Sequence, residues 1–131
     1  MLKVKIVTPN GLYGTFEASK VHVTTKLGEC ALLPNHIPLV AMLEISKLIL
    51  TIKDEDKIFA ISGGILHLHG NEIDLLVNAI EGKEDIDLER AQRSAERAKL
   101  RLEKKDANTS IRRAEVALKR AINRIDIKNG L

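Results

Sequence analysis

Three arginines carry the most distinctive chemistry in this sequence. Arg120 and Arg124 lie one helical turn apart, and Arg90 precedes them in a separate helical segment. If the two segments form an antiparallel hairpin that turns near residues 107–108, Arg90 falls level with Arg124, with Arg120 about one turn away. Guanidinium groups bind phosphate oxygens through paired, charge-assisted hydrogen bonds, and a helix N-terminus also favours anions. This spacing predicts a polyphosphate site, with ion pairs inside the hairpin as the alternative.

Two acidic residues lie near the same end of the expected hairpin. Glu81 precedes the first helical segment, and Asp87 lies at its start. Because carboxylates accept hydrogen bonds, either residue could bind the amino group of a base or a hydroxyl of a sugar. This end of the hairpin therefore combines phosphate-binding groups with groups suited to a nucleoside.

The other candidates for catalysis or metal binding are weaker. His67 and His69 alternate on an expected strand and share one face, but no pattern of Cys, Asp or Glu around them completes a metal site. His36 follows a Pro-Asn pair without an adjacent nucleophile, and Cys30 lacks the basic neighbour that activates a thiol. We therefore expect no metal site and no active site of its own in this chain.

The elements that would position these groups change near residue 83. Residues 1–83 contain all three prolines, seven of the eight glycines and no arginine, whereas residues 84–131 contain all eight arginines. Eight lysines against nine acids give the first part a net charge of −1, and thirteen basic against nine acidic residues give the second part +4. Such a break in turn formers and charge indicates two domains, 1–83 and 84–131.

The first part has the pattern of an antiparallel β-sandwich with about ten short strands. Leu2, Val4 and Ile6 alternate with lysines, which is the period of a half-buried strand. Turn formers separate the apolar runs: a Ser-Gly-Gly turn is expected at 62–64, and a Gly-Asn turn within 65–75 would close a hairpin.

The second part has the pattern of a two-helix hairpin over residues 86–104 and 110–127, with a polar, cap-forming turn at 106–110. The apolar faces are rich in alanine, so they bury little area and the hairpin needs a surface to dock on. Like charges one turn apart repel in the basic rows at 93–105 and 120–128. The first row fits either a solvated face or a bound partner, and the second an acidic partner or ligand. The apolar stripes are Ala91, Ala95, Ala98 and Leu102, then Ile111, Ala114, Leu118, Ala121 and Ile125.

Composition limits the other function classes. The pI near 9.1 suggests nucleic acid, but the net charge of +3 is small and the aromatic residues Tyr13, Phe16 and Phe59 lie far from the basic ones. No apolar run reaches the ~20 residues of a membrane span, and the N-terminus lacks the apolar core of a secretory signal. We expect a cytosolic protein that contacts a membrane only through a partner, with a free-standing anion- or nucleic-acid-binding module as the alternative.

Three motifs, in order, resemble one known family. Residues 28–39 (GECALLPNHIPL) are similar to the segment G-E-L-G-x-x-P-G-H-x-P-L of the epsilon subunit of bacterial F-type ATP synthase, called delta in mitochondria. Residues 62–66 (SGGIL) resemble its S-G-G-[FI]-[LV] segment, and residues 86–91 (IDLERA) its I-D-x-x-R-A motif. The chain departs at Cys30, Ala31 and Asn35. Asparagine tolerates positive φ, so the Pro-Asn turn is expected to survive, whereas Ala31 fits less well if its backbone needs positive φ.

The resemblance implies a non-catalytic rotor subunit of the F1 sector of a proton-translocating ATP synthase, peripheral to the cytoplasmic face of the cell membrane. The sandwich is expected to bind the gamma subunit and rest on the ring of c subunits, with Glu29 and His36 in the ring-facing loop. The hairpin is expected to switch between a compact state and an extended state that reaches the catalytic alpha and beta subunits and blocks ATP hydrolysis.

The resemblance also implies that the hairpin senses ATP as a regulatory ligand, without any cofactor. The residues that match are Ile86, Asp87, Arg90 and Ala91 from the I-D-x-x-R-A motif, Arg120 and Arg124 from a later basic pair, and Glu81 from the acid before the hairpin.

Overall fold

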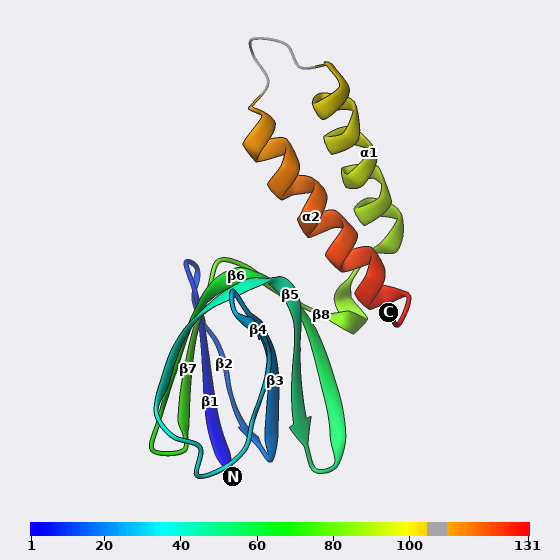
Figure 1. Cartoon of the computed structure of the whole chain (residues 1–131). Helices are drawn as coiled ribbons and strands as arrows, with labels where there is room; N and C mark the ends of the chain where they lie inside the picture. Colours follow the sequence, from blue (N-terminus) through cyan, green and yellow to red (C-terminus); the bar gives the residue numbers. More distant parts are fainter. Residues whose placement is uncertain (105–109) are drawn as a thin grey trace. The chain divides into compact units, whose positions relative to one another are not determined.

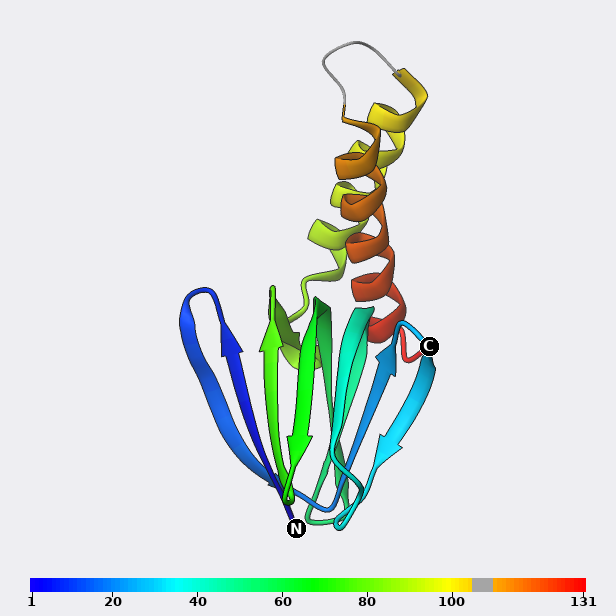
Figure 2. The ribbon, with the colours of Figure 1, turned by 60° about the vertical axis from the view of Figure 1, so that its left-hand side comes forward.

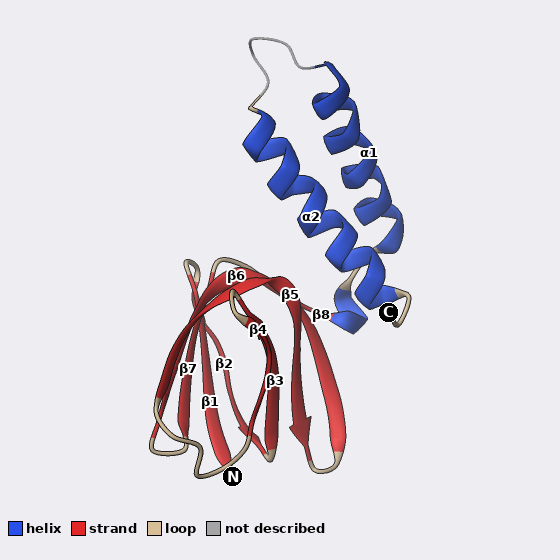
Figure 3. Ribbon diagram, in the orientation of Figure 1, coloured by secondary structure: helices blue, strands red, loops and turns tan. Residues whose placement is uncertain are grey.

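A computed structural model describes residues 1–104 and 110–131, which divide into two compact units, Met1–Gly82 and Lys83–Leu131. The strands belong to the first unit and the helices to the second (Figure 3). In chain order the elements are β1 (Leu2–Thr8), β2 (Gly11–Ala18), β3 (Lys20–Thr25), β4 (Gly28–Leu32), β5 (Leu39–Ile52), β6 (Glu55–His69), β7 (Glu72–Val77), β8 (Ile80–Gly82), the 3₁₀ helix η1 (Lys83–Asp85), α1 (Leu88–Lys104) and α2 (Ile111–Lys128) (Figure 1).

The strands form a single sheet in the order β2-β1-β7-β6-β5-β3-β4, with β8 paired to β6 (Figure 2). Its pairs are antiparallel, as the sequence predicts, except that β1 runs parallel to β7. A parallel pair needs a long crossover connection, and here the strands between β1 and β7 in the chain provide it. Along β1 the expected alternation is confirmed, because Leu2, Val4 and Ile6 are fully buried.

The sheet folds over on itself into a sandwich. Phe16 on the edge strand β2 lies 6.0 Å from Phe59 on β6 between ring centroids, and Tyr13 of β2 lies 6.1 Å from the same ring. In a flat sheet β2 and β6 would be about 14 Å apart, at about 4.8 Å for each strand step. The enclosed core consists of Leu2, Val4, Ile6, Ala18, Val21, Val23, Leu32, Leu43, Leu48, Leu50, Phe59, Ile61, Leu66, Leu68, Ile73, Leu75 and Val77.

The described residues form eight strands, fewer than the roughly ten that the turn spacing predicts. Residues 62–64 lie inside one continuous strand, β6, so the turn predicted there was wrong. Gly63 and Gly64 have φ values of +88° and +152°, and a Cβ on Gly64 would overlap the Leu76 carbonyl. Glycine lets β6 bend here and change partners from β8 to β7 without a turn.

Two other predicted turns, at Gly70–Asn71 and at Pro34–Asn35, are confirmed. Gly70 and Asn71 join β6 to β7 with φ values of +54° and +63°, as a type I′ hairpin turn requires. Asn35 has a φ of +68°, so it takes the conformation expected of the family's glycine, and its N–H donates to Asn71 Oδ1 at 2.6 Å. Ala31 lies within β4 and is not among the positive-φ residues, so no glycine is needed there.

The helical unit is an antiparallel hairpin with an alanine seam (Figure 3). The fully or nearly buried residues are Ala91, Ala95 and Ala98 of α1 and Ala114, Ala121 and Ile127 of α2. Ile111, which the sequence pattern places in this seam, is 48% exposed because it is the first residue of α2. The alanine stripes are thus confirmed. Ile127 is buried as well, but thirteen residues at about 100° each place it on another face of α2 than Ala114.

Ser110 starts α2 as its N-cap, with its Oγ accepting the N–H of Arg113 at 3.3 Å. This bond satisfies one of the amide groups left unpaired at a helix start. The rest of the polar turn predicted at 106–110, and Lys105 of the first basic row, lie outside the described residues.

Candidate functional site

The start of α1 and the end of α2 meet through a hydrogen bond. Lys128, in the last turn of α2, donates from Nζ to the backbone carbonyl of Lys83 in η1 at 3.2 Å. Arg124 lies one turn before Lys128, and Arg90 lies in the first turn of α1. The structure therefore brings Arg90 and Arg124 to the same end of the hairpin, as the antiparallel arrangement predicts.

Arg90 and Arg120 are both exposed, but they line different surface grooves. Each groove has a volume in the usual range for small-molecule sites, about 300–1,000 Å³. One groove, of about 470 Å³, is lined by Arg90, Arg93, Glu96, Arg97 and Leu100. The other, of about 490 Å³, is lined by Ser110, Arg112, Arg113, Val116, Ala117 and Arg120.

The groove at Arg90 adds two arginines that the sequence pattern assigns to a solvated basic face. Arg93 and Arg97 share the face of Arg90 because residues three and seven positions apart align on a helix. That spacing is visible in the sequence, but the I-D-x-x-R-A motif ends at Ala91 and does not include these two arginines. An anion at Arg90 would therefore also meet the guanidinium groups of Arg93 and Arg97.

Asp87 has a structural role at this end of the hairpin. Its Oδ1 accepts the N–H of Arg90 at 3.1 Å, and its carbonyl oxygen accepts the N–H of Ala91 at 3.0 Å. Asp87 is thus the N-cap of α1, where a carboxylate also interacts favourably with the helix dipole. Asp87 is an exposed residue, so its side chain is also accessible to a ligand.

The remaining motif residues lie in less accessible places. Ile86 is 3% exposed and Ala91 is fully buried, so neither side chain is open to a ligand. Either residue can contact a ligand only through its backbone. Glu81 lies in β8 of the sandwich unit, opposite Ala60 of β6, and is half-buried.

The sandwich carries a second candidate site, a groove of about 400 Å³ between the β3–β4 turn and the start of β5. Leu27 is 100% exposed, Val40 68% and Met42 60%, and all three line this groove. Scattered exposed apolar residues are ordinary, but a contiguous group around a groove marks an interaction surface. The remaining lining residues are Thr25, Lys26, Gly28, Glu29, Cys30, Leu39 and Ala41.

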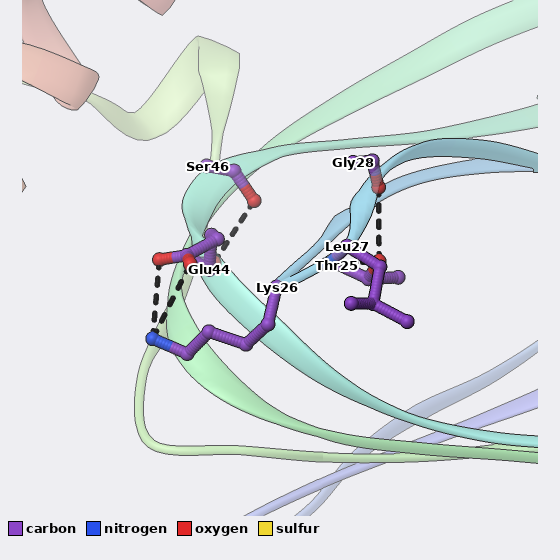
Figure 4. Close-up of polar contacts among 6 residues, drawn as sticks. All are labelled: Thr25, Lys26, Leu27, Gly28, Glu44 and Ser46. Atoms are coloured by element: carbon purple, nitrogen blue, oxygen red, sulfur yellow. Dashed lines mark hydrogen bonds and ion pairs between the residues drawn. The ribbon is translucent and has the colours of Figure 1, made fainter.

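The turn that presents Leu27 is held by polar contacts (Figure 4). The Thr25 hydroxyl donates to the Gly28 carbonyl at 2.9 Å and accepts the N–H of Leu27 at 3.1 Å. Lys26 Nζ forms an ion pair with Glu44 of β5 at 3.3 Å. Leu27 is therefore presented to solvent by a turn with its own hydrogen bonds, which lowers the entropy cost of binding a partner there.

The two residues expected to face the c-ring differ in setting. Glu29 is exposed near the start of β4 and lines the apolar groove. His36 lies in the loop beyond the other end of β4, half-buried, with its Nδ1 at 2.7 Å from the Ile37 carbonyl. Only Glu29 of this pair joins the groove around Leu27.

Family comparison matches both units in order. The β-sandwich domain of the ATP synthase delta/epsilon chain matches residues 1–83, and the long α-helix domain of the same chain matches residues 84–129. This chain belongs to the ATP synthase delta/epsilon family. The ATP synthase epsilon chain of Clostridium novyi is 45% identical over 127 residues, covering 95% of each chain. That of Bacillus velezensis is 41% identical over 126 residues, covering 96% of each.

The fold of the delta/epsilon family is also found in a solved assembly. A chain in the cryo-EM structure of the Euglena gracilis mitochondrial ATP synthase, comprising OSCP, F1 and c-ring, aligns with a TM-score of 0.83. It is 20% identical and covers 93% of this chain and 78% of that chain. Among the described residues of this family member, no helix combines the length and apolar character needed to cross a membrane.

Proposed function

We propose that this chain is the epsilon-type, non-catalytic central-stalk subunit of the F1 sector of a proton-translocating ATP synthase. The proposal is carried by the match of both units, in order, to the two domains of this family. Relatives that align over nearly their whole length are named ATP synthase epsilon chain. In this role the chain works at the cytoplasmic face of the membrane, as a peripheral part of the complex. A free-standing anion- or nucleic-acid-binding module is not favoured, because residues 1–129 match the two domains of the family.

The apolar groove around Leu27 is the surface we propose for the gamma subunit. Its exposed apolar side chains suit a permanent protein interface, and the hydrogen-bonded turn at Thr25 presents Leu27 in a defined position. We propose that Glu29, at the edge of this groove, and His36 contact the ring of c subunits. Gamma and the ring are thereby coupled through one unit.

The gamma contact is tested by capture of purified gamma subunit on the immobilised full-length chain. Leu27→Asp and Met42→Asp each place a carboxylate in the apolar groove, so binding should weaken at least about tenfold, which corresponds to about 1.4 kcal/mol. Lys57→Asp, which adds the same group at an exposed position outside the groove, should bind like the unaltered chain. Unchanged gamma binding in both groove variants would mean that gamma binds another surface of the chain. A lack of gamma binding by the unaltered chain would overturn the rotor assignment.

We further propose that the hairpin binds ATP at the end that carries Asp87, Arg90 and Arg124, with Ile86 and Ala91 contributing backbone and packing. Of the other residues that the family resemblance adds, Arg120 lines a separate groove of α2 and Glu81 belongs to the sandwich unit. The guanidinium groups would bind the phosphates, and the Asp87 carboxylate would accept hydrogen bonds from the nucleoside. Binding would stabilise the compact hairpin by RT ln(1 + [L]/Kd), about 2.7 kcal/mol at a hundredfold excess over Kd. In the extended state the same basic residues of α2 would meet acidic surface on the alpha and beta subunits and oppose ATP hydrolysis.

Calorimetric titration of the full-length chain with ATP and then ADP tests this proposal. Saturable binding that favours ATP should be lost in Arg90→Ala and in Arg124→Ala. Arg101→Ala removes an exposed arginine further along α1 and should leave the affinity unchanged. If Arg90→Ala and Arg124→Ala both bind ATP as tightly as the unaltered chain, the site assignment is wrong and the rotor assignment still stands.

A further inference from the structure

The outer face of the β6–β7 hairpin gathers three metal-ligating side chains. His67 and His69 come from β6 and Asp74 from β7. Their ligand atoms, one from each residue, all lie within 4.8 Å of one another. The two histidines alone made no site in the linear sequence, because the acid that completes the group comes from the neighbouring strand.

The hairpin register places these residues together. The type I′ turn at Gly70 and Asn71 pairs His69 with Glu72, and His67 is then directly opposite Asp74. Cross-strand partners and residues two apart on one strand share a face of the sheet. The cluster is therefore built on paired backbone rather than on a loop, which holds its Cα positions in place.

The distances are close to those of a bound transition metal. Zinc bonds of about 2.0–2.1 Å to nitrogen and oxygen, at tetrahedral angles, separate two ligand atoms by about 3.4 Å. His69 Nε2 already lies 3.4 Å from Asp74 Oδ2. The ring of His67 lies beside that of His69, at 4.6 Å between centroids, so a side-chain rotation is enough to complete a three-ligand set.

The three side chains are accessible to solvent, and their donor atoms suit one class of metal ion. The His69 and Asp74 side chains are each 44% exposed, and His67 is exposed, so an ion can enter and solvent can fill a fourth position. Two imidazoles with one carboxylate suit zinc and its transition-metal neighbours, whereas calcium and magnesium prefer all-oxygen sites. We propose that His67, His69 and Asp74 bind one divalent transition-metal ion, with Zn²⁺ as the representative.

The test is a titration of tag-free, full-length protein with Zn²⁺ alone, followed by calorimetry and by NMR of the histidine ring signals. One equivalent should bind, shift the His67 and His69 ring signals together, and be removed by a chelator. His69→Gln and Asp74→Asn each delete one ligand, so affinity should fall at least about tenfold, since even the loss of an outer-shell partner costs 10–100-fold.

His36→Gln is the matched control, because it removes a histidine of the same unit that lies outside the cluster. Its Zn²⁺ affinity should equal that of the unaltered chain. All three changed positions are at least partly exposed, so circular dichroism should report an intact sandwich in each variant. Failure of the unaltered chain to bind saturably, or equal binding in His69→Gln, Asp74→Asn and His36→Gln, would overturn the site. This outcome is independent of the rotor assignment.

Discussion

Asp87 has an observed role as a helix cap and a proposed role in ATP binding. One carboxylate oxygen caps α1 by accepting the Arg90 N–H, and the same bond ties the cap to the residue expected to bind phosphate. A ligand that drew the carboxylate away would weaken the first turn of α1. The cap and the proposed ATP contact are therefore coupled at this residue.

Two substitutions separate these roles. Asp87→Ala removes the cap acceptor and should destabilise the helical unit by about 1 kcal/mol. Asp87→Asn keeps a side-chain acceptor at the cap, so it should destabilise the unit by no more than a few tenths of a kcal/mol. Hydrogen exchange of the first-turn amides of α1 measures the difference. If the carboxylate also binds ATP, both variants should weaken ATP binding. Equal destabilisation by the two variants would mean that the charge, rather than the cap geometry, matters.

At the scale of an element, β6 depends on two adjacent glycines. The strand pairs with β8 before Gly63 and with β7 from Gly64 onward, so the bend between them joins two parts of the sheet. Gly64 also packs directly against the backbone of Leu76. A side chain at this position is excluded by both φ and space.

Gly64→Ala is therefore expected to destabilise the sandwich by more than about 3 kcal/mol, or to prevent folding, because backbone strain and overlap with the Leu76 carbonyl act together. Gly11→Ala is the control: its φ is +113°, but a Cβ there meets nothing within 4 Å. Strain alone should cost about 1–3 kcal/mol at Gly11. Urea unfolding of both variants checks the order, and equal costs would show that the close approach at Leu76 relaxes easily.

At the scale of the whole molecule, the two units differ in how they could fold. The sandwich core is made entirely of residues between Leu2 and Val77, with none from the helices. The helical seam is mostly alanine, which buries little area for the entropy of ordering two helices. We therefore expect the sandwich to fold alone and the hairpin to depend on other surfaces.

A fragment of residues 1–82 should unfold cooperatively and keep its affinity for gamma, while losing ATP binding. The complementary fragment 83–131 should be only partly helical in water, because isolated helices of this length are marginally stable there. Its helix content should rise when a helix-promoting co-solvent is added. Thermal circular dichroism and gamma capture measure both. An aggregated 1–82 fragment would show that the sandwich needs the helical unit.

Local sequence signals determined the two-part architecture and the ends of several elements. Period-two alternation identified β1, the alanine stripes identified both helices, and Ser110 was recognised as a cap former. These signals depend on residues a few positions apart, so they can be recognised without knowing the tertiary fold. The Gly70–Asn71 turn belongs to this class, and its register would have revealed Asp74 opposite His67.

Other features were decided only by tertiary structure. The Ser-Gly-Gly segment predicted a turn because glycine usually ends a strand, yet here it bends β6 where another strand's backbone comes close. The contact of Phe16 with Phe59 and the parallel pairing of β1 with β7 likewise depend on distant neighbours. Sequence by itself determined the family, the two domains and the arginine-bearing end of the hairpin. Which faces close, and which side chains meet across strands, follows from long-range packing that no local pattern encodes.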